Sequence, residues 1–278
     1  MKKLEFLIID PQNDFCDKKG SLSVPRADGD LERLAEVIKR LSRKITDIHV
    51  TLDSHHYFDI SHPVFWINSV GEHPSPITVI TKDDMKNGTW RTTVPTCQNR
   101  KSMESHGLNR DGAKEYLEAL ETGNRYPHCI WPPHCLIGSW GFSIFPVLYE
   151  VISNWEKEVN GRSVNFVTKG SNFMTEHFSG IMAEVPDPQD PSTQLNTKLI
   201  ETLQNADIIA LSGQALSHCV ANTVRDIANN FGEENIKKFV LIKDTTSPVQ
   251  GFENVGEDFV TEMVGRGMQI STSKEFFV

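Results

Sequence analysis

The sequence lacks the features that mark several classes of protein. Neither a GxGxxG nor a GxxxxGKS/T phosphate loop occurs in its 278 residues, so nucleotide-dependent chemistry has no support. Basic residues are few, because 28 lysines and arginines stand against 37 acidic residues, and the formal net charge is −9. This charge has the wrong sign for non-specific binding to nucleic acid or to an anionic membrane. We therefore expect no nucleic-acid partner and no membrane partner, and a small molecule is the expected ligand.

Cysteines are few, and long apolar runs are missing. The five cysteines are an odd number without a repeating spacing, which argues against a disulfide framework and favours a reducing compartment. The apolar run at residues 4–9 contains Glu5 and ends at Asp10, so it is too short for a signal peptide or a membrane span. These observations predict a cytoplasmic protein.

The composition is that of an ordinary globular protein, with 38% apolar and 23% charged residues. Runs rich in β-branched residues alternate with stretches of 3.6-residue apolar spacing. We expect strands at residues 3–10, 45–53, 163–169, 206–213, 239–244 and 268–272, and helices at 31–44, 142–159, 193–204, 219–231 and 254–267. Such alternation predicts right-handed βαβ units. The expected fold class is therefore α/β, a three-layer α/β/α sandwich with a mostly parallel sheet.

One long segment, from about residue 65 to 128, breaks this alternation. It is rich in proline, glycine, asparagine, threonine and charge, with a strand expected at 77–81 and a helix at 112–121. A segment of this length inside a domain usually covers a functional site or contacts a partner. We interpret residues 1–278 as a single domain with an insertion at about 65–128.

Polar residues end several of the predicted strands. Asp10, Asp53 and Lys169 each close a strand, and the strand at 206–213 leads into Cys219. In an open parallel sheet the carboxyl ends of the strands meet at one edge, where ligands bind. A solvated strand end is the common fate of one such residue, but several of them together predict a shared site.

Cys219 stands where a buried-strand pattern gives way to a helical one. A thiol in the first turn of a helix meets unpaired backbone N–H groups and the positive end of the helix dipole, which favour the thiolate and can bind a developing oxyanion. A neighbouring Lys169 would lower the thiol pKa further, and the Asp10 carboxylate can accept the thiol proton. The alternative is a cysteine that only fills the core.

A second group of residues could hold a metal ion. Asp53 and His55 are two positions apart, and in an extended segment such residues project to the same side. His134, fixed between prolines and Cys135 in the run IWPPHC, is reached through the long insertion. One carboxylate and two imidazoles suit a zinc-like ion that acts as a Lewis acid or anchors a substrate. The spacing leaves open the alternative that both histidines only form hydrogen bonds in a loop-covered core.

The motifs occur in the order of a known family. They are FLIIDPQNDFC (6–16), GSL (20–22), VTLDSHH (50–56), DIS (59–61), WPPHC (131–135), TKG (168–170), SGQALSHCV (212–220), LIKDTTS (241–247) and GMQISTSKEF (267–276). With these motifs the chain resembles the isochorismatase-like cysteine hydrolases, and within them the nicotinamidases most of all. The resemblance covers the chain except the insertion at about 65–128.

The resemblance implies a catalytic triad of Asp10, Lys169 and Cys219. In such enzymes the cysteine attacks an amide carbonyl, and the backbone N–H groups of Ala215 and Cys219 form the oxyanion hole. A non-proline cis peptide bond between Gln214 and Ala215 accompanies this arrangement. The substrate is then hydrolysed through a thioester intermediate.

The resemblance also implies one divalent metal ion held by Asp53, His55 and His134, with zinc first and iron or manganese as alternatives. Phe15 would line the pocket for the substrate ring. Members of the family are commonly oligomeric, so a homo-oligomer is expected.

Four positions depart from the family pattern. Ser54 and His56 stand where the family has tryptophan and proline, and the loss of the tryptophan removes an expected aromatic wall. Asp59 replaces a histidine and is a candidate fourth metal ligand. Gln214 stands where a small apolar residue is usual. These changes lie where the substrate is chosen.

The implied activity is that of an amidohydrolase acting on non-peptide C–N bonds, which cleaves a small carboxamide to an acid and ammonia. The first candidate substrate is nicotinamide, which would place the enzyme in NAD salvage. A different small amide or ureido substrate is the first alternative. A non-catalytic binding member of the family is the second.

Overall fold

A single parallel sheet organises the computed structural model, which describes residues 2–93, 110–123, 126–158 and 161–277. The strand order is β5-β2-β1-β6-β7-β8, and all neighbours pair in parallel. The strands are β1 (Leu4–Ile9), β2 (Ile45–Asp53), β5 (Asn165–Lys169), β6 (Ile208–Gly213), β7 (Phe239–Ile242) and β8 (Gln269–Ser271). Every residue of β1 is buried, as a central strand covered on both faces requires.

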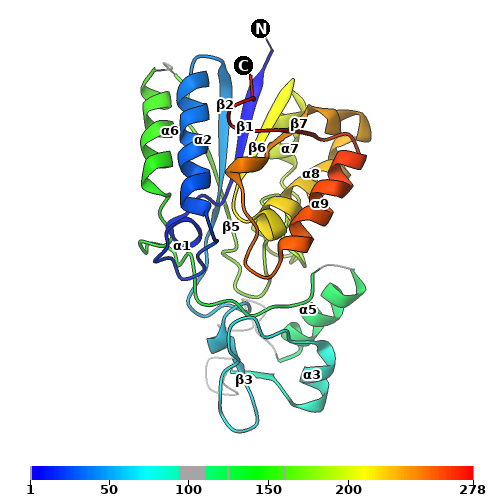
Figure 1. Ribbon diagram of the computed structural model, residues 1–278. Coiled ribbons are helices and arrows are strands. Elements are labelled where there is room, and N and C mark those ends of the chain that lie inside the picture. Colours follow the sequence, from blue (N-terminus) through cyan, green and yellow to red (C-terminus); the bar gives the residue numbers. More distant parts are fainter. Residues whose placement is uncertain (1, 94–109, 124–125, 159–160, 278) are drawn as a thin grey trace.

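Helices cover both faces of the sheet (Figure 1). On one face lie α2 (Ala27–Leu41) and α6 (Pro146–Glu158), and on the other lie α7 (Thr197–Gln204), α8 (Ala221–Phe231) and α9 (Glu253–Gly265). Along β1, Phe6 and Ile8 pack in the first layer and Leu7 and Ile9 in the second, since side chains alternate along a strand. The predicted three-layer α/β/α sandwich is confirmed.

The ends of the elements differ from the predicted ones by a few residues. The strand expected from residue 163 begins at Asn165, and the helix expected at 31–44 begins earlier, at Ala27. The first turn of α2 carries Asp28 and Asp30, which suit the positive end of the helix dipole. The prediction missed this turn because the apolar spacing starts only at Leu31.

The described residues of the segment at 65–128 form a small lobe beyond one end of the sheet (Figure 1). It contains an antiparallel pair, β3 (Trp66–Ile67) and β4 (Arg91–Thr92), and the helices α3 (Lys82–Asn87) and α5 (Arg110–Thr122). The helix expected at 112–121 is confirmed as part of α5. The lobe has its own hydrophobic cluster, in which Phe65, Trp66 and Leu117 are buried. Residues 94–109, with Cys97, lie outside the described residues, and the single-domain interpretation stays a prediction.

The strand expected at 77–81 is wrong. Ile77 has a φ of +69°, which lies in the left-handed region and interrupts an extended backbone. Val79 forms only an isolated bridge to Cys129. The apolar run ITVIT predicts a strand, but the part after Ile77 is short and pairs with residues 128–130 only around this one bridge.

Two further observations concern cysteines and apolar helices. The four cysteines that the structure describes are free and buried. Among the described residues no helix is long and apolar enough to cross a membrane.

Close packing at the end of β6 generates a first prediction. Gly213 has a φ of +112°, and a Cβ atom there would lie 2.0 Å from the backbone oxygen of Ile9 in the neighbouring strand. We expect Gly213→Ala to lower the free energy of unfolding by about 3 kcal/mol or more, because β1 and β6 would have to separate. Urea unfolding followed by circular dichroism measures this change.

Gly265→Ala is the matched control. Gly265 ends α9, and a Cβ atom added there meets nothing within 4 Å. This substitution should leave the stability unchanged or raise it by up to about 1 kcal/mol. Equal stability of both variants would contradict the proposed contact.

Candidate active site

The predicted site residues lie together at the carboxyl edge of the sheet. Asp10 follows β1 directly, Asp53 ends β2 and Lys169 ends β5. Cys219 lies in η3 (Leu216–Val220), a five-residue π-helical segment that leads from β6 into α8. Cys219 therefore lies in a helical turn, as expected, but this turn is π-helical and begins at Leu216. Because β5, β2, β1 and β6 are neighbours, residues far apart in the sequence meet at one point.

Lys169 is the centre of this cluster. Its Nζ lies 3.0 Å from Asp10 Oδ2, 3.0 Å from Asp53 Oδ1 and 3.7 Å from Cys219 Sγ, and it donates a hydrogen bond of 2.7 Å to the carbonyl of His177. Burial by itself lowers the pKa of Lys169, but the carboxylates of Asp10 and Asp53 outweigh it and raise this pKa well above its ordinary value. The lysine is therefore a permanent buried cation.

Burial shifts the pKa of both Cys219 and Asp10 upward. Burial raises the pKa of the Cys219 thiol well above its ordinary value; Lys169 lowers it, and Asp10 and Asp53 raise it further. Burial also raises the pKa of Asp10, which accepts a hydrogen bond of 2.5 Å from Thr51 Oγ1. The net shift therefore runs against the expected preference for the thiolate, although Lys169 acts in the expected direction. The arrangement instead supplies a thiol with a carboxylate at hand to take its proton.

Ala215 lies immediately before η3, after a cis peptide bond that joins it to Gln214. This is the bond that the family resemblance implies. The Gln214 side chain is buried, donates to Asp30 Oδ2 at 3.1 Å and accepts from the backbone N–H of Ser247 at 3.2 Å. Gln214 is absent from the residues that line the pocket beside Cys219, so this departure from the family pattern ties β6 to α2 rather than choosing a substrate.

Asp53, His55 and His134 form a buried group whose ligand atoms all lie within 4.8 Å of one another. Asp53 Oδ2 lies 3.1 Å from His55 Nε2 and 3.4 Å from His134 Nε2. His134 Nδ1 lies 2.9 Å from the carbonyl of Pro132, which can only accept, so this nitrogen carries the proton and Nε2 is free to coordinate. The donor set and its burial fit a divalent metal ion of the zinc type.

Asp59 acts as a support for this group rather than as a fourth ligand. Its Oδ2 lies 3.0 Å from His55 Nδ1, on the side of the ring opposite the Nε2 that faces Asp53. Its Oδ1 accepts hydrogen bonds from the backbone N–H and the hydroxyl of Ser61, at 3.0 and 2.8 Å. A carboxylate in this position orients the imidazole and raises its basicity.

A third histidine belongs to the neighbourhood of the metal group and was not assigned from the sequence. The ring of His62 lies 5.1 Å from that of His55 and 5.5 Å from that of His134, between centroids. Burial lowers the pKa of His62 to about 3, so this ring is neutral. No motif marked this residue, because its position depends on the turn after β2.

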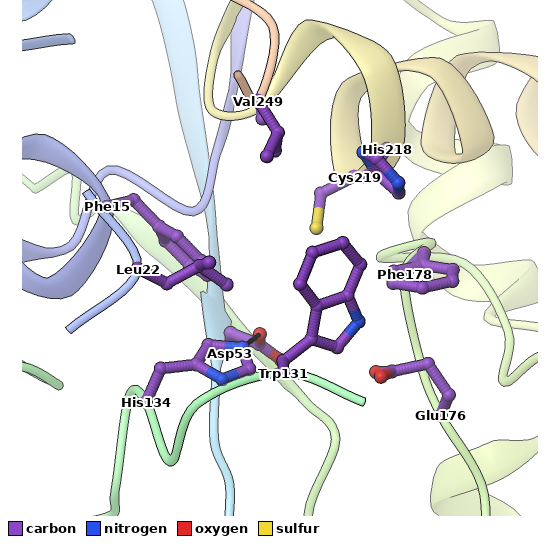
Figure 2. Close-up of a pocket in the computed structure, with 11 residues that line it drawn as sticks. Phe15, Leu22, Asp53, Trp131, His134, Glu176, Phe178, His218, Cys219 and Val249 are labelled. Carbon is purple, nitrogen blue, oxygen red and sulfur yellow. Dashed lines mark ion pairs between the residues drawn. The ribbon is translucent and has the colours of Figure 1, made fainter. Parts of the chain in front are cut away.

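A narrow pocket of about 20 Å³ opens beside Cys219 (Figure 2). Its apolar wall consists of Phe15, Leu22, Trp131, Phe178, Ala215 and Val249, and its polar wall of Asp53, His134, Glu176, His218 and Cys219. The sulfur of Cys219 points into it, close to Trp131 (Figure 2). The pocket thus joins the sulfur to the metal group.

Phe15 lines the pocket as expected, but the aromatic wall has a different origin from the one in the family pattern. Ser54, at the position of the missing tryptophan, donates to the carbonyl of Leu52 at 2.9 Å. Trp131 and Phe178 supply aromatic surface instead, with ring centroids 6.4 Å apart. No sequence motif marked Phe178 as a pocket residue, although it lies shortly after the TKG motif.

Comparison with known proteins supports the fold. No protein-family model matches the sequence, and no curated protein matches it. A nicotinamidase of yeast superposes with a TM-score of 0.64 at 18% identity, over 96% of this chain and 98% of its own. A nicotinamidase/pyrazinamidase of Acinetobacter baumanii gives 0.63 at 17% identity, over 99% and 98%. A pyrazinamidase of Pyrococcus horikoshii, solved in complex with zinc, gives 0.55 at 16% identity, over 97% and 99%.

The chain therefore has the isochorismatase-like fold of the nicotinamidases and pyrazinamidases. The resemblance that the motifs predict is confirmed at the level of the fold. The roles of individual residues rest on the geometry described above.

The metal group generates a second prediction. His134→Ala should lower the bound divalent metal by about tenfold or more at a fixed metal concentration, because one of its three donors is lost. Mass spectrometry of the dialysed protein measures the content. His56→Ala is the matched control, since His56 is exposed beside His55 and should leave the content unchanged. Equal metal content in the two variants would remove His134 as a ligand.

The buried Glu176 generates a third prediction, for the metal-free protein. Burial raises the pKa of Glu176 from 4.5 to about 7, so the folded protein holds this proton over a range in which the unfolded chain has lost it. Stability therefore falls as the pH rises from about 4.5 to 7. Glu176→Gln cannot lose a proton, so its stability should not show this fall. Between pH 5 and 8 the free energy of unfolding of Glu176→Gln, relative to that of the wild type, should rise by up to about 3 kcal/mol. Parallel urea unfolding curves for the two proteins would contradict the shift.

Proposed function

We propose that the protein is a metal-containing cysteine amidohydrolase that cleaves a small carboxamide to the acid and ammonia through a thioester, with nicotinamide as the first candidate substrate. The observation that carries the proposal is the buried cluster in which one ammonium group contacts Asp10, Asp53 and Cys219 at the pocket. Two proteins of the same fold support the substrate class: a yeast nicotinamidase solved with the inhibitor nicotinaldehyde, and PnC1 of L. infantum solved with nicotinate.

The proposed acylation begins with the Cys219 thiol. Asp10 takes the thiol proton while the sulfur bonds to the carbonyl carbon of the amide. The backbone N–H groups of Ala215 and Cys219 hold the resulting oxyanion. Asp10 then returns the proton to the amide nitrogen, the C–N bond breaks and ammonia leaves.

Deacylation completes the proposed cycle. A water molecule gives a proton to Asp10 and adds to the thioester, the C–S bond breaks, and the sulfur regains its proton. Lys169 keeps its charge throughout and stabilises the anions formed beside it, because its pKa is far above neutral. Asp53, His55 and His134 would hold the divalent ion, which when bound supplies a Lewis acid that can anchor a substrate ring nitrogen or order water.

The remaining parts of the proposal follow from the family resemblance. Zinc is the first candidate metal, with iron and manganese as alternatives, and the zinc complex of the Pyrococcus horikoshii pyrazinamidase supports this order. Hydrolysis of nicotinamide would place the protein in NAD salvage in the cytoplasm, as a homo-oligomer.

The fourth prediction tests the nucleophile. Cys219→Ala should lower ammonia release from nicotinamide or pyrazinamide by about 10⁴-fold or more, because the proposed acyl bond forms on the Cys219 sulfur. The assay compares metal-replete wild type and variant at equal concentration. Cys129→Ala is the control, since Cys129 is a buried thiol that does not line the pocket.

Two outcomes would count against the proposal. Residual activity of Cys219→Ala close to that of the wild type would mean a different nucleophile. Silence of the wild type on every small amide would favour the non-catalytic alternative.

A further inference from the structure

Glu176 places a carboxylate at the pocket that has no role in the proposed reaction. It lies in the loop after β5, it is 4% exposed and it lines the pocket together with Cys219. Its Oε1 accepts a hydrogen bond of 2.9 Å from the backbone N–H of His177, but its buried Oε2 has no partner among the described residues. A buried acceptor without a partner costs free energy, so native structures rarely retain one without a ligand or water to satisfy it.

Trp131 has an unsatisfied donor that complements the unsatisfied acceptor of Glu176. Its indole Nε1 is a buried donor without a partner among the described residues, and the ring lines the same pocket. Edge-to-face contacts with Phe178 and His218 fix the ring, at centroid distances of 6.4 and 5.3 Å. The carboxylate end of Glu176 points toward this indole (Figure 2). One pocket thus contains a free acceptor and a free donor that face the same region.

The backbone on both sides prevents Glu176 from turning away. Its N–H donates to the hydroxyl of Tyr116 in α5 at 3.3 Å, and its carbonyl accepts from the N–H of Glu184 at 2.8 Å. Tyr116 is itself buried in the cluster of the small lobe. The insertion therefore contributes to the pocket indirectly, because its residue Tyr116 holds the loop that carries Glu176.

Within the part of the chain that the structure describes, Glu176 forms no ion pair. Burial is the largest cause of its raised pKa of about 7, and Asp53 and Asp59 raise it further while His55 lowers it. An N–H or O–H group that donates to Oε2 would stabilise the ionised form, as hydrogen bonds to charged groups do. An unsubstituted aromatic ring offers no such donor.

We propose that Glu176 is a specificity-determining residue: its Oε2 accepts a hydrogen bond from a second polar group of the substrate, and Trp131 Nε1 donates one to that group. The group must both donate and accept, as a hydroxyl, a second carboxamide or a ureido group does. The substrate class becomes a small carboxamide with such a group away from the attacked carbonyl. This inference rests on the proposed amidohydrolase function.

Matched aromatic amides test the inference through turnover. The panel is benzamide, its 2-, 3- and 4-hydroxy derivatives, the corresponding methoxy compounds and nicotinamide, with ammonia release as the signal. At least one hydroxy compound should exceed both benzamide and its methoxy partner in kcat/KM by about tenfold or more, the size expected for a hydrogen bond to a charged group. Glu176→Leu should abolish this preference, and Glu176→Gln, which keeps an acceptor, should restore part of it.

Two further variants separate the proposed contact from general effects. Trp131→Phe keeps the ring and removes only the N–H donor, so it should reduce the hydroxy preference with little effect on benzamide. Glu184→Gln neutralises another buried carboxylate that does not line the pocket, and the preference should survive. Equal preference in the wild type and in Glu176→Leu would overturn the inference even if all compounds are hydrolysed.

A binding measurement distinguishes this inference from the proposed function. Calorimetry with metal-replete Cys219→Ala compares the hydroxy and methoxy compounds without turnover. The best hydroxy compound should bind about tenfold more tightly than its methoxy partner, and the added Glu176→Leu change should remove the difference. Equal binding would overturn the role of Glu176. Silence in the ammonia assay with retained hydroxy selectivity in binding would overturn only the amidohydrolase proposal.

Discussion

The buried ammonium of Lys169 is the interaction on which the rest of the site depends. Removing two carboxylates and an ammonium from water costs several kcal/mol per ion, and only close mutual contact offsets that cost. The contacts of 3.0 Å from Lys169 Nζ to Asp10 and Asp53 supply it. These contacts require three parallel strands, β5, β2 and β1, to end side by side. The charge balance of the site therefore depends on the order of the strands in the sheet. The short segment after β6 then brings Cys219 to the same point and completes the cluster around Lys169.

Asp53 links the candidate catalytic group to the candidate metal group. Its Oδ1 contacts Lys169, while its Oδ2 faces His55 and His134. A metal ion on Oδ2 would withdraw charge that otherwise stabilises the lysine, so the two groups cannot be electrostatically independent. Asp59 stands behind His55 and orients it. The pocket between these groups is mostly apolar, which leaves the few polar atoms in it, above all those of Glu176, to decide which molecule is bound.

Much of this arrangement could be predicted from local patterns. The alternation of β-branched and amphipathic runs predicted the sheet and its two helical layers, and the polar residues at strand ends marked Asp10, Asp53 and Lys169. Local patterns failed where the backbone departs from regular geometry. Ile77 turns into the left-handed region and breaks the strand expected at 77–81. Cys219 lies in a π-helical segment that apolar spacing cannot distinguish from the helix after it.

The sequence by itself determined the fold class and the candidate chemical groups, because periodicity, strand-end residues and motif order are local properties of the chain. Only the tertiary structure decided how those groups act. Burial sets the pKa of the Cys219 thiol above its ordinary value, although position in the chain suggested the opposite. Long-range contacts turn Gln214 toward Asp30 and hold Glu176 at the pocket through Tyr116. Desolvation and contacts between distant segments exist only in the folded chain, and they choose the protonation states and the shape of the pocket.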